Sequence, residues 1–162
     1  MLQNFIDWAS STAVNSWVLS NAWAWPAMET LHFFGLCLML GALLIIDTRL
    51  MGYFKSVSFD AVHKLLPWAF IGFAINLITG LVFLFGDPAR YVPNIGFRLK
   101  LILIVLGGLN AAYYYWKLHG RLGQLEVNGD ATSLAKLVGS ASLVFWFGVL
   151  IMGRLIPYVG TG

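Results

Sequence analysis

Four long apolar blocks are the feature that most constrains what this chain can fold into. They cover about residues 27–51, 62–85, 95–118 and 133–156, and each is long enough to cross a hydrocarbon layer roughly 30 Å thick as a helix. Only 10% of the residues are charged, whereas soluble domains usually carry about a quarter. Because lipid cannot hydrogen-bond the backbone, each block must be helical. The sequence predicts an all-α integral membrane protein.

Short connections join the four predicted spans. Pro26 precedes the first span at a position where a missing N–H costs least, and a Gly-Asp-Pro turn at 86–88 ends the second. Short connections make consecutive helices antiparallel. We therefore expect residues 26–162 to form one up-down four-helix bundle surrounded by the lipid bilayer.

Residues 1–25 differ from the spans, because aromatic and aliphatic side chains alternate there with Asn, Ser and Thr. Tryptophans are favoured at the membrane–water interface. We expect this segment to be an amphipathic helix in that interface. No Lys or Arg precedes Arg49, so the charged leader of a signal peptide is missing and we expect the N-terminus to be retained.

Basic residues favour one side of the membrane. The side with the loops after the first and third spans carries Arg49, Lys55, Lys64, Lys117, Arg121 and Lys136, and the other carries Arg90, Arg98, Lys100 and Arg154. Cytoplasmic loops are enriched in Lys and Arg, so both termini are predicted outside the cytoplasm. This scattering at span ends is typical of membrane proteins and does not indicate nucleic-acid binding, despite the pI near 9.2.

Small residues at helical spacing predict close packing between spans. Gly107 with Ala111, and Gly108 with Ala112, are small-xxx-small pairs in the third span. We expect both pairs to face neighbouring helices.

His32 is the residue that most strongly suggests a cofactor. An ionisable residue inside a span is costly, so function is the default hypothesis. Glu29 and His32 share one face of the first span near its outer end. A neutral imidazole can bind haem iron or copper, and Met28 and Met152 occupy the same outer half. The first interpretation is therefore one haem b, or less favourably copper, with His32 as ligand.

Lys100 and Arg154 form a cationic pair in the outer quarter of the third and fourth spans. Such a pair can bind a haem propionate, a lipid phosphate or a quinone headgroup. The alternative is a structural layer of ion pairs in which Glu29 is the counter-ion, with His32 bonded to one of these charged groups. The sequence leaves both interpretations open.

Two more histidines lie at the cytoplasmic end, where His63 begins the second span and His119 ends the third. They could face each other, and a second metal or haem site is conceivable there. The alternative is that both are solvated beside neighbouring basic residues.

The remaining polar residues of the spans have structural interpretations. Asp47 and Arg49 are expected to form an anchoring pair at the inner end of the first span, with the Arg49 head reaching toward water. Asn76 and Thr79 in the second span and Asn110 in the third predict interhelical hydrogen bonds, each stabilising by about 1 kcal/mol.

Several short motifs together resemble a bacterial family of four-span membrane proteins that carry a domain of unknown function. They are P-A-M-E-T-L-H at 26–32, D-T-R-L-M-G at 47–52, G-F-A-I-N-L-I-T-G at 72–80, F-R-L-K at 97–100 and G-L-N at 108–110. The resemblance implies a bacterial inner-membrane protein and supplies no activity. The family-pattern positions that it marks are Glu29, His32, Asp47, Arg49, Asn76, Lys100 and Asn110. It also implies a histidine near the end of the third span, which here is displaced to His119.

Other chemistry is missing from the sequence. It has no Gly-rich phosphate loop, no H-E-x-x-H, no G-x-S-x-G and only one cysteine, Cys37. We therefore expect no enzyme, and no chain of acids or broken helix indicates a pump or permease. Two function classes remain, with a copper or small-molecule handling membrane protein as a less favoured third. One is a redox subunit with haem b at His32, and the other is a cofactor-free accessory subunit that docks on a larger membrane complex or on itself.

Overall fold

The predicted all-α architecture is confirmed by the computed structural model, which describes residues 2–122 and 129–160. Its helices, in chain order, are α1 (Leu2–Ser10), α2 (Ala13–Ser20), α3 (Ala24–Leu50), α4 (Phe59–His63), α5 (Leu66–Gly86), α6 (Pro88–Tyr91), α7 (Ile95–Tyr113), the π-helix η1 (Tyr114–Leu118), α8 (His119–Leu122) and α9 (Ser133–Leu155). Four stretches are long and apolar enough to cross a membrane, namely α3, α4 with α5, α7 through α8, and α9. The chain is a multi-pass membrane protein.

Two spans depart from regular α-helix. The second is interrupted between α4 and α5, and Pro67 lies in the first turn of α5, where its missing N–H is tolerated. The third continues beyond Tyr113 as the π-helix η1 before α8. Neither interruption is visible in the hydrophobic pattern.

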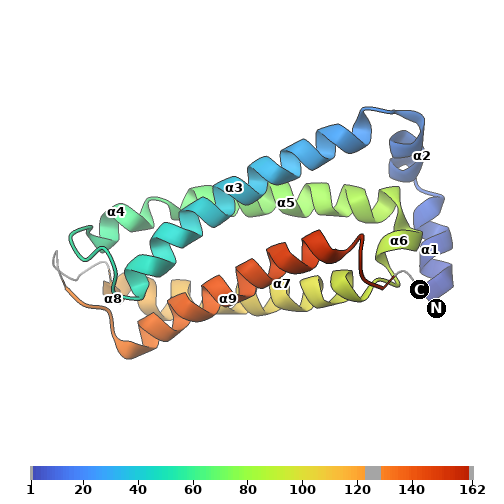
Figure 1. Cartoon of the computed structure of the whole chain (residues 1–162). Coiled ribbons are helices and arrows are strands. Elements are labelled where there is room, and N and C mark those ends of the chain that lie inside the picture. Colours follow the sequence, from blue (N-terminus) through green and yellow to red (C-terminus); the bar gives the residue numbers. More distant parts are fainter. Residues whose placement is uncertain (1, 123–128, 161–162) are drawn as a thin grey trace.

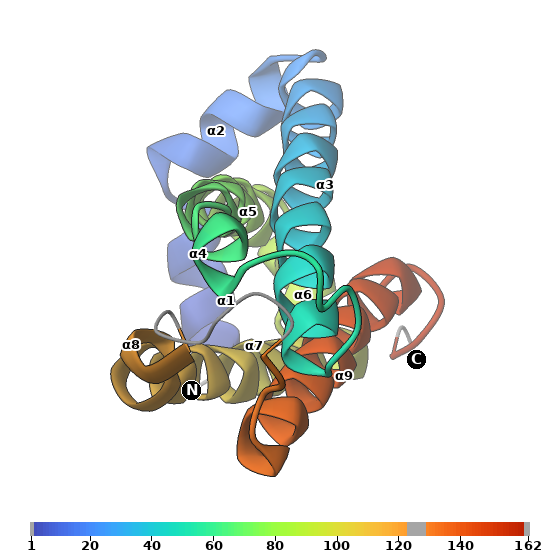
Figure 2. The ribbon, with the colours of Figure 1, turned by 90° about the vertical axis from the view of Figure 1, so that its left-hand side faces the viewer.

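The helices pack as two antiparallel pairs. α3 lies on α5 and α7 lies on α9, and the pairs meet where α9 crosses α3, as Figure 2 shows end-on. Gly35 and Gly72 allow the first pair to approach closely, because a Cβ on Gly72 would lie 2.6 Å from the Met39 backbone nitrogen and 2.7 Å from the Gly35 carbonyl oxygen. Gly107 packs against Trp146, as expected, whereas Gly108 has nothing within 4 Å of a Cβ. The packing prediction for Gly108 is therefore wrong.

One end of the bundle, here named the terminal end, carries α1, α2, α6 and both ends of the chain (Figure 1). The N-terminal segment forms two helices that fold across this end. Asn15 Nδ2 on α2 donates to the carbonyls of Phe85 and Gly86, at 2.9 and 3.1 Å. Asn94 Nδ2, which is fully buried, donates to the Ile156 carbonyl at 2.8 Å. These bonds fix the terminal helices and the segment after α9 on the bundle.

The opposite end, here named the loop end, is organised around Arg49, which is 1% exposed. Its Nε donates to the Val57 carbonyl at 2.7 Å, and its Nη2 donates to the Gly129 carbonyl at 3.0 Å. The guanidinium also lies 3.9 Å from the centre of the Phe59 ring. The expected ion pair with Asp47 is not formed, because side chains two positions apart on a helix do not face each other. Arg49 instead joins two loops and does not reach toward water.

Candidate functional site

His32 lies on the inward face of α3, one turn before Gly35, and is half-buried. Its Nδ1 is 2.7 Å from the hydroxyl oxygen of Thr79 on α5. That hydroxyl also lies 2.7 Å from the Ile75 carbonyl, which can only accept. A hydroxyl has one proton, so Thr79 donates to Ile75 and accepts from His32. The imidazole therefore carries its proton on Nδ1 and keeps a lone pair on Nε2.

One aromatic ring packs against His32 at the terminal end, and two more pack against that ring. The Phe83 ring centre lies 5.4 Å from the imidazole, and Trp25 and Tyr91 lie 5.2 and 6.5 Å from Phe83. Tyr91 comes from α6, which the turn after α5 folds back over the bundle. The outer histidine therefore lies beside a largely aromatic wall.

The charged residues predicted at this end do not form a layer of ion pairs. Glu29 is exposed and accepts a hydrogen bond from Trp25 Nε1 at 3.1 Å. Arg154 is exposed and lies 5.4 Å from the centre of the Tyr158 ring. Among the described residues, no ion pair joins Glu29 to Lys100 or Arg154. The hydrogen-bond partner of His32 is Thr79, which the sequence indicated only as an interhelical contact.

Lys100 and Met152 are both half-buried near the terminal end. The Lys100 ammonium lies 3.3 Å from the position that a Cβ on Gly153 would occupy, so this cation faces α9. The Met152 carbonyl lies 3.4 Å from the corresponding position on Gly96. Of the two cations predicted at this end, Lys100 therefore lies within the bundle, whereas Arg154 is exposed.

The two histidines of the loop end face each other, as the sequence suggested. Their ring centres are 4.1 Å apart, with 42° between the ring planes. The Tyr114 hydroxyl is hydrogen-bonded to His63 Nε2, and Tyr115 stacks on His119 with 5.5 Å between ring centres. The Nδ1 atom of His119 is buried and has no partner among the described residues.

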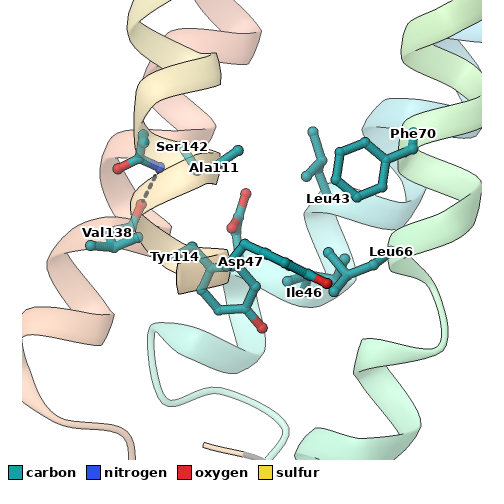
Figure 3. Close-up of a pocket in the computed structure, with 11 residues that line it drawn as sticks. Leu43, Ile46, Asp47, Leu66, Phe70, Ala111, Tyr114, Val138 and Ser142 are labelled. Atoms are coloured by element: carbon teal, nitrogen blue, oxygen red, sulfur yellow. Dashed lines mark hydrogen bonds between the residues drawn. The ribbon is translucent and has the colours of Figure 1, made fainter. Parts of the chain in front are cut away.

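A cavity of about 40 Å³ lies between α3, α5, α7 and α9, close to these histidines. The carboxylate of Asp47 points into it (Figure 3), and Tyr114 and Ser142 line it. Asp47 is 3% exposed, and its Oδ2 has no partner in the described parts of the chain. Since a water needs roughly 10–15 Å³, the cavity can hold a few waters that would satisfy this oxygen. Organic cofactors usually occupy about 300 Å³ or more.

The predicted polar residues are thus divided between separate places. Asn110 lines the same cavity and donates to the Val138 carbonyl on α9 at 3.1 Å, which confirms its interhelical bond. Asn76 Nδ2 donates instead to Gly72 on its own helix at 3.0 Å. Asp47 and Asn110 belong to the loop end, whereas Glu29 belongs to the terminal end.

The fold defines a class, that of α-helical multi-pass membrane proteins. Comparisons with protein-family models, with curated proteins and with solved structures find no match. Within residues 2–122 and 129–160, no group of three or more His, Cys, Asp or Glu side chains is placed to hold a metal ion. Function is therefore inferred from the two histidine-containing ends.

Proposed function

We propose that this chain is a small subunit of a redox complex in the bacterial inner membrane, and that Nε2 of His32 is the ligand of one haem b. The observation that carries the proposal is the 2.7 Å bond between His32 Nδ1 and Thr79. Histidines that bind metals usually donate their other N–H to a protein acceptor, which fixes the tautomer and the ring orientation. Thr79 acts on His32 in this way.

A haem suits this end better than a bare copper ion. A porphyrin brings four nitrogens to its iron, so one protein ligand is enough, whereas a copper site needs several nitrogen or sulfur ligands. His32 is the only histidine near the terminal end. The Phe83 ring beside it, at 5.4 Å, offers an apolar aromatic surface for a flat macrocycle.

The charges at the terminal end fit the propionates of a haem. Lys100 is a half-buried cation on α7 that has no ion pair in the described parts of the chain. Cation–carboxylate bonds are among the stronger hydrogen bonds in proteins. We assign the propionate contact to Lys100, and to Arg154 only if its side chain leaves Tyr158.

A single histidine at this end supports a role as a subunit. A second axial ligand would come from Met152 or from a partner membrane protein, including a second copy of the chain. We assign both termini to the periplasm, because Lys and Arg are more frequent on the loop end, which supports a cytoplasmic location for that end.

The test is the visible absorption spectrum of the detergent-purified protein. We expect a Soret band that shifts on reduction with dithionite and disappears in His32→Ala. The matched control is His119→Ala, which removes a histidine at the other end and should leave the band unchanged. A folded, colourless preparation that contains no iron by elemental analysis contradicts the haem assignment.

The second candidate is a cofactor-free structural subunit, and the same His32–Thr79 bond favours it. This bond joins α3 to α5 beside the close Gly35–Gly72 contact without needing any cofactor. A colourless chain that migrates with a larger complex on a blue-native gel would support this role. Under that reading, His32→Ala would weaken the folded bundle and change no spectrum.

A further inference from the structure

The histidine pair of the loop end lies far from the proposed haem ligand. His63 closes α4 and His119 opens α8, so two different spans bring the imidazoles together, 4.1 Å apart between ring centres. Tyr114 on η1 adds a phenolic oxygen in hydrogen-bond contact with His63. We infer that His63, His119 and Tyr114 form a second site, which binds one transition-metal ion of the Cu²⁺ or Zn²⁺ class.

The ring separation excludes a haem sandwiched between these two histidines. Ligands at about 2.0 Å on opposite sides of a metal hold their nitrogens about 4 Å apart, and the ring centres then lie farther apart still. The two imidazoles are too close for that arrangement. They are close enough to occupy neighbouring positions on one small ion.

An unsatisfied nitrogen points to the same conclusion. Nδ1 of His119 is buried without a partner among the described residues, and such groups are rare enough to need an explanation. A neutral imidazole nitrogen without a proton is a metal ligand. An ion that binds there and at His63 Nε2 replaces the hydrogen bond between Nε2 and the Tyr114 hydroxyl, and the Tyr114 oxygen then lies next to that ion. Two imidazoles with an oxygen suit copper, zinc or nickel.

The backbone places His119 for this role. Residues 114–118 form the π-helix η1, in which one extra residue per turn rotates all later side chains by about 100° relative to a continuous α-helix. Short π-helical segments often mark functional sites. Tyr115 then stacks on His119 and restricts the plane of its ring.

Charges of both signs lie near the pair, with the basic residues Lys64, Lys117 and Arg121 within two positions of the histidines. Lys64, the residue after His63, forms an ion pair with Asp60 at 3.3 Å. Asp47 lines the cavity that also contacts Tyr114, so a carboxylate lies on the inner side of the pair. The remaining coordination positions would be filled by water, because no third His, Cys, Asp or Glu joins the pair in the described ranges.

The experiment is a metal titration of the full chain, purified in detergent through a tag that contains no histidine. Cu²⁺ and Zn²⁺ are titrated separately by calorimetry, and bound metal is counted by elemental analysis after desalting. We expect one ion per chain, with affinity at least tenfold weaker in His63→Ala and in His119→Ala. His32→Ala tests whether the ion binds at the other end of the bundle instead. The matched control is Thr48→Val, whose hydroxyl bonds only to carbonyls of its own helix and which should bind the metal as the wild type does. Gel filtration confirms that each variant is folded.

A second measurement covers variants that fail to fold. The electron paramagnetic resonance spectrum of the wild-type Cu²⁺ complex should show two coordinated nitrogens, and His63→Gln or His119→Gln should reduce that number. The inference is overturned if the wild type binds no stoichiometric metal, or if the variants at His63 and His119 both bind the metal as tightly as the wild type. It is also overturned if His32→Ala is the only variant that loses binding. The Soret band is measured separately, so failure of the haem proposal can be distinguished from failure of the metal site at the loop end.

Discussion

The orientation of His32 depends on a single hydroxyl. Thr79→Val keeps the branched shape of the side chain and removes the oxygen that lies 2.7 Å from His32 Nδ1. Loss of such a supporting bond usually weakens metal binding by about 10–100-fold, whereas the bundle loses only about 1 kcal/mol. We expect a reduced haem content in a folded protein, measured by the ratio of Soret to protein absorbance.

The matched control for this variant is Thr48→Val. The Thr48 hydroxyl is bonded to carbonyls of its own helix, Leu44 and Ile45, and touches no histidine. It should leave the haem content unchanged. Equal occupancy in the Thr79 and Thr48 variants would show that the hydroxyl of Thr79 does not orient the ligand.

Arg49 is the residue whose loss should destabilise the loop end most directly. Arg49→Met removes two charge-assisted bonds, at 2.7 and 3.0 Å, and leaves the carbonyls of Val57 and Gly129 without them. Each such bond contributes about 1.5–3 kcal/mol, so we expect a clear fall in melting temperature. Arg98→Met, at an exposed arginine, is the control and should change little. Similar melting temperatures in the two variants would contradict the role of Arg49 as a buried side chain that holds two loops together.

Which polar residues matter could be predicted from the sequence, but their partners could not. His32, Asp47, Arg49 and Asn110 all stand out because they are polar within apolar spans. The partner of His32 is Thr79, which lies on another helix. The sequence of neither helix determines how the two are rotated against each other. The expected Asp47–Arg49 pair was wrong for a local reason, because residues two apart on a helix point in different directions.

At the scale of helices, the contact between α3 and α5 depends on Gly72. A Cβ there would lie 2.6 Å from the Met39 nitrogen and 2.7 Å from the Gly35 carbonyl oxygen, and backbone atoms cannot move aside cheaply. Overpacking of this kind usually costs about 1–3 kcal/mol. Gly72→Ala should therefore lower the unfolding free energy in detergent, measured by denaturation with increasing SDS.

Gly80 on the same helix provides the comparison, since a Cβ there meets nothing within 4 Å. Gly80→Ala should be neutral or slightly stabilising, because alanine has the higher helix propensity. If both alanine variants unfold at the same SDS fraction, the close α3–α5 contact is not a determinant of stability.

The existence and length of the spans follow from hydrophobicity alone, since lipid leaves the backbone no other conformation. The details inside them do not. Lys64 and Pro67 lie at the interruption between α4 and α5, and Lys117 lies in the π-helix at 114–118, but the hydrophobic pattern predicts neither change of helix geometry. They depend on tertiary contacts, and the second of them decides where His119 lies.

At the scale of the whole molecule, an ion cluster joins the loop after α3 to the start of α9. Asp130 lies 2.9 Å from Lys136 Nζ and 3.1 Å from Lys55 Nζ. Hydrogen bonds from Lys136 and Lys55 lower the pKa of Asp130 from 3.8 to about 2. The ionised form is therefore favoured in the folded state, so this contribution to stability is present above about pH 4 and is lost as the pH falls toward 2.

The prediction compares the wild type with Asp130→Asn by thermal unfolding in detergent. The wild type should melt higher at pH 6, and the difference should shrink as the pH is lowered to 2. Salt should also reduce it, since the cluster is partly exposed. Asp60→Asn, which removes the more exposed pair with Lys64, should show a smaller effect at pH 6. A difference between wild type and Asp130→Asn that does not depend on pH would exclude a role for the charge.

The arrangement of the whole chain predicts its topology, because both ends of the chain lie at the terminal end (Figure 1). An even number of spans requires this. From the excess of Lys and Arg at the loop end we propose that this end faces the cytoplasm. In a Cys37→Ala background, single cysteines replace Gln3 and Tyr158 at the terminal end and Lys55 at the loop end, so that each reports one side of the membrane. A membrane-impermeant maleimide added to intact spheroplasts should label the first two positions and not the third. Labelling at Lys55 alone would reverse the orientation, and labelling at only one terminus would contradict the four-span fold itself.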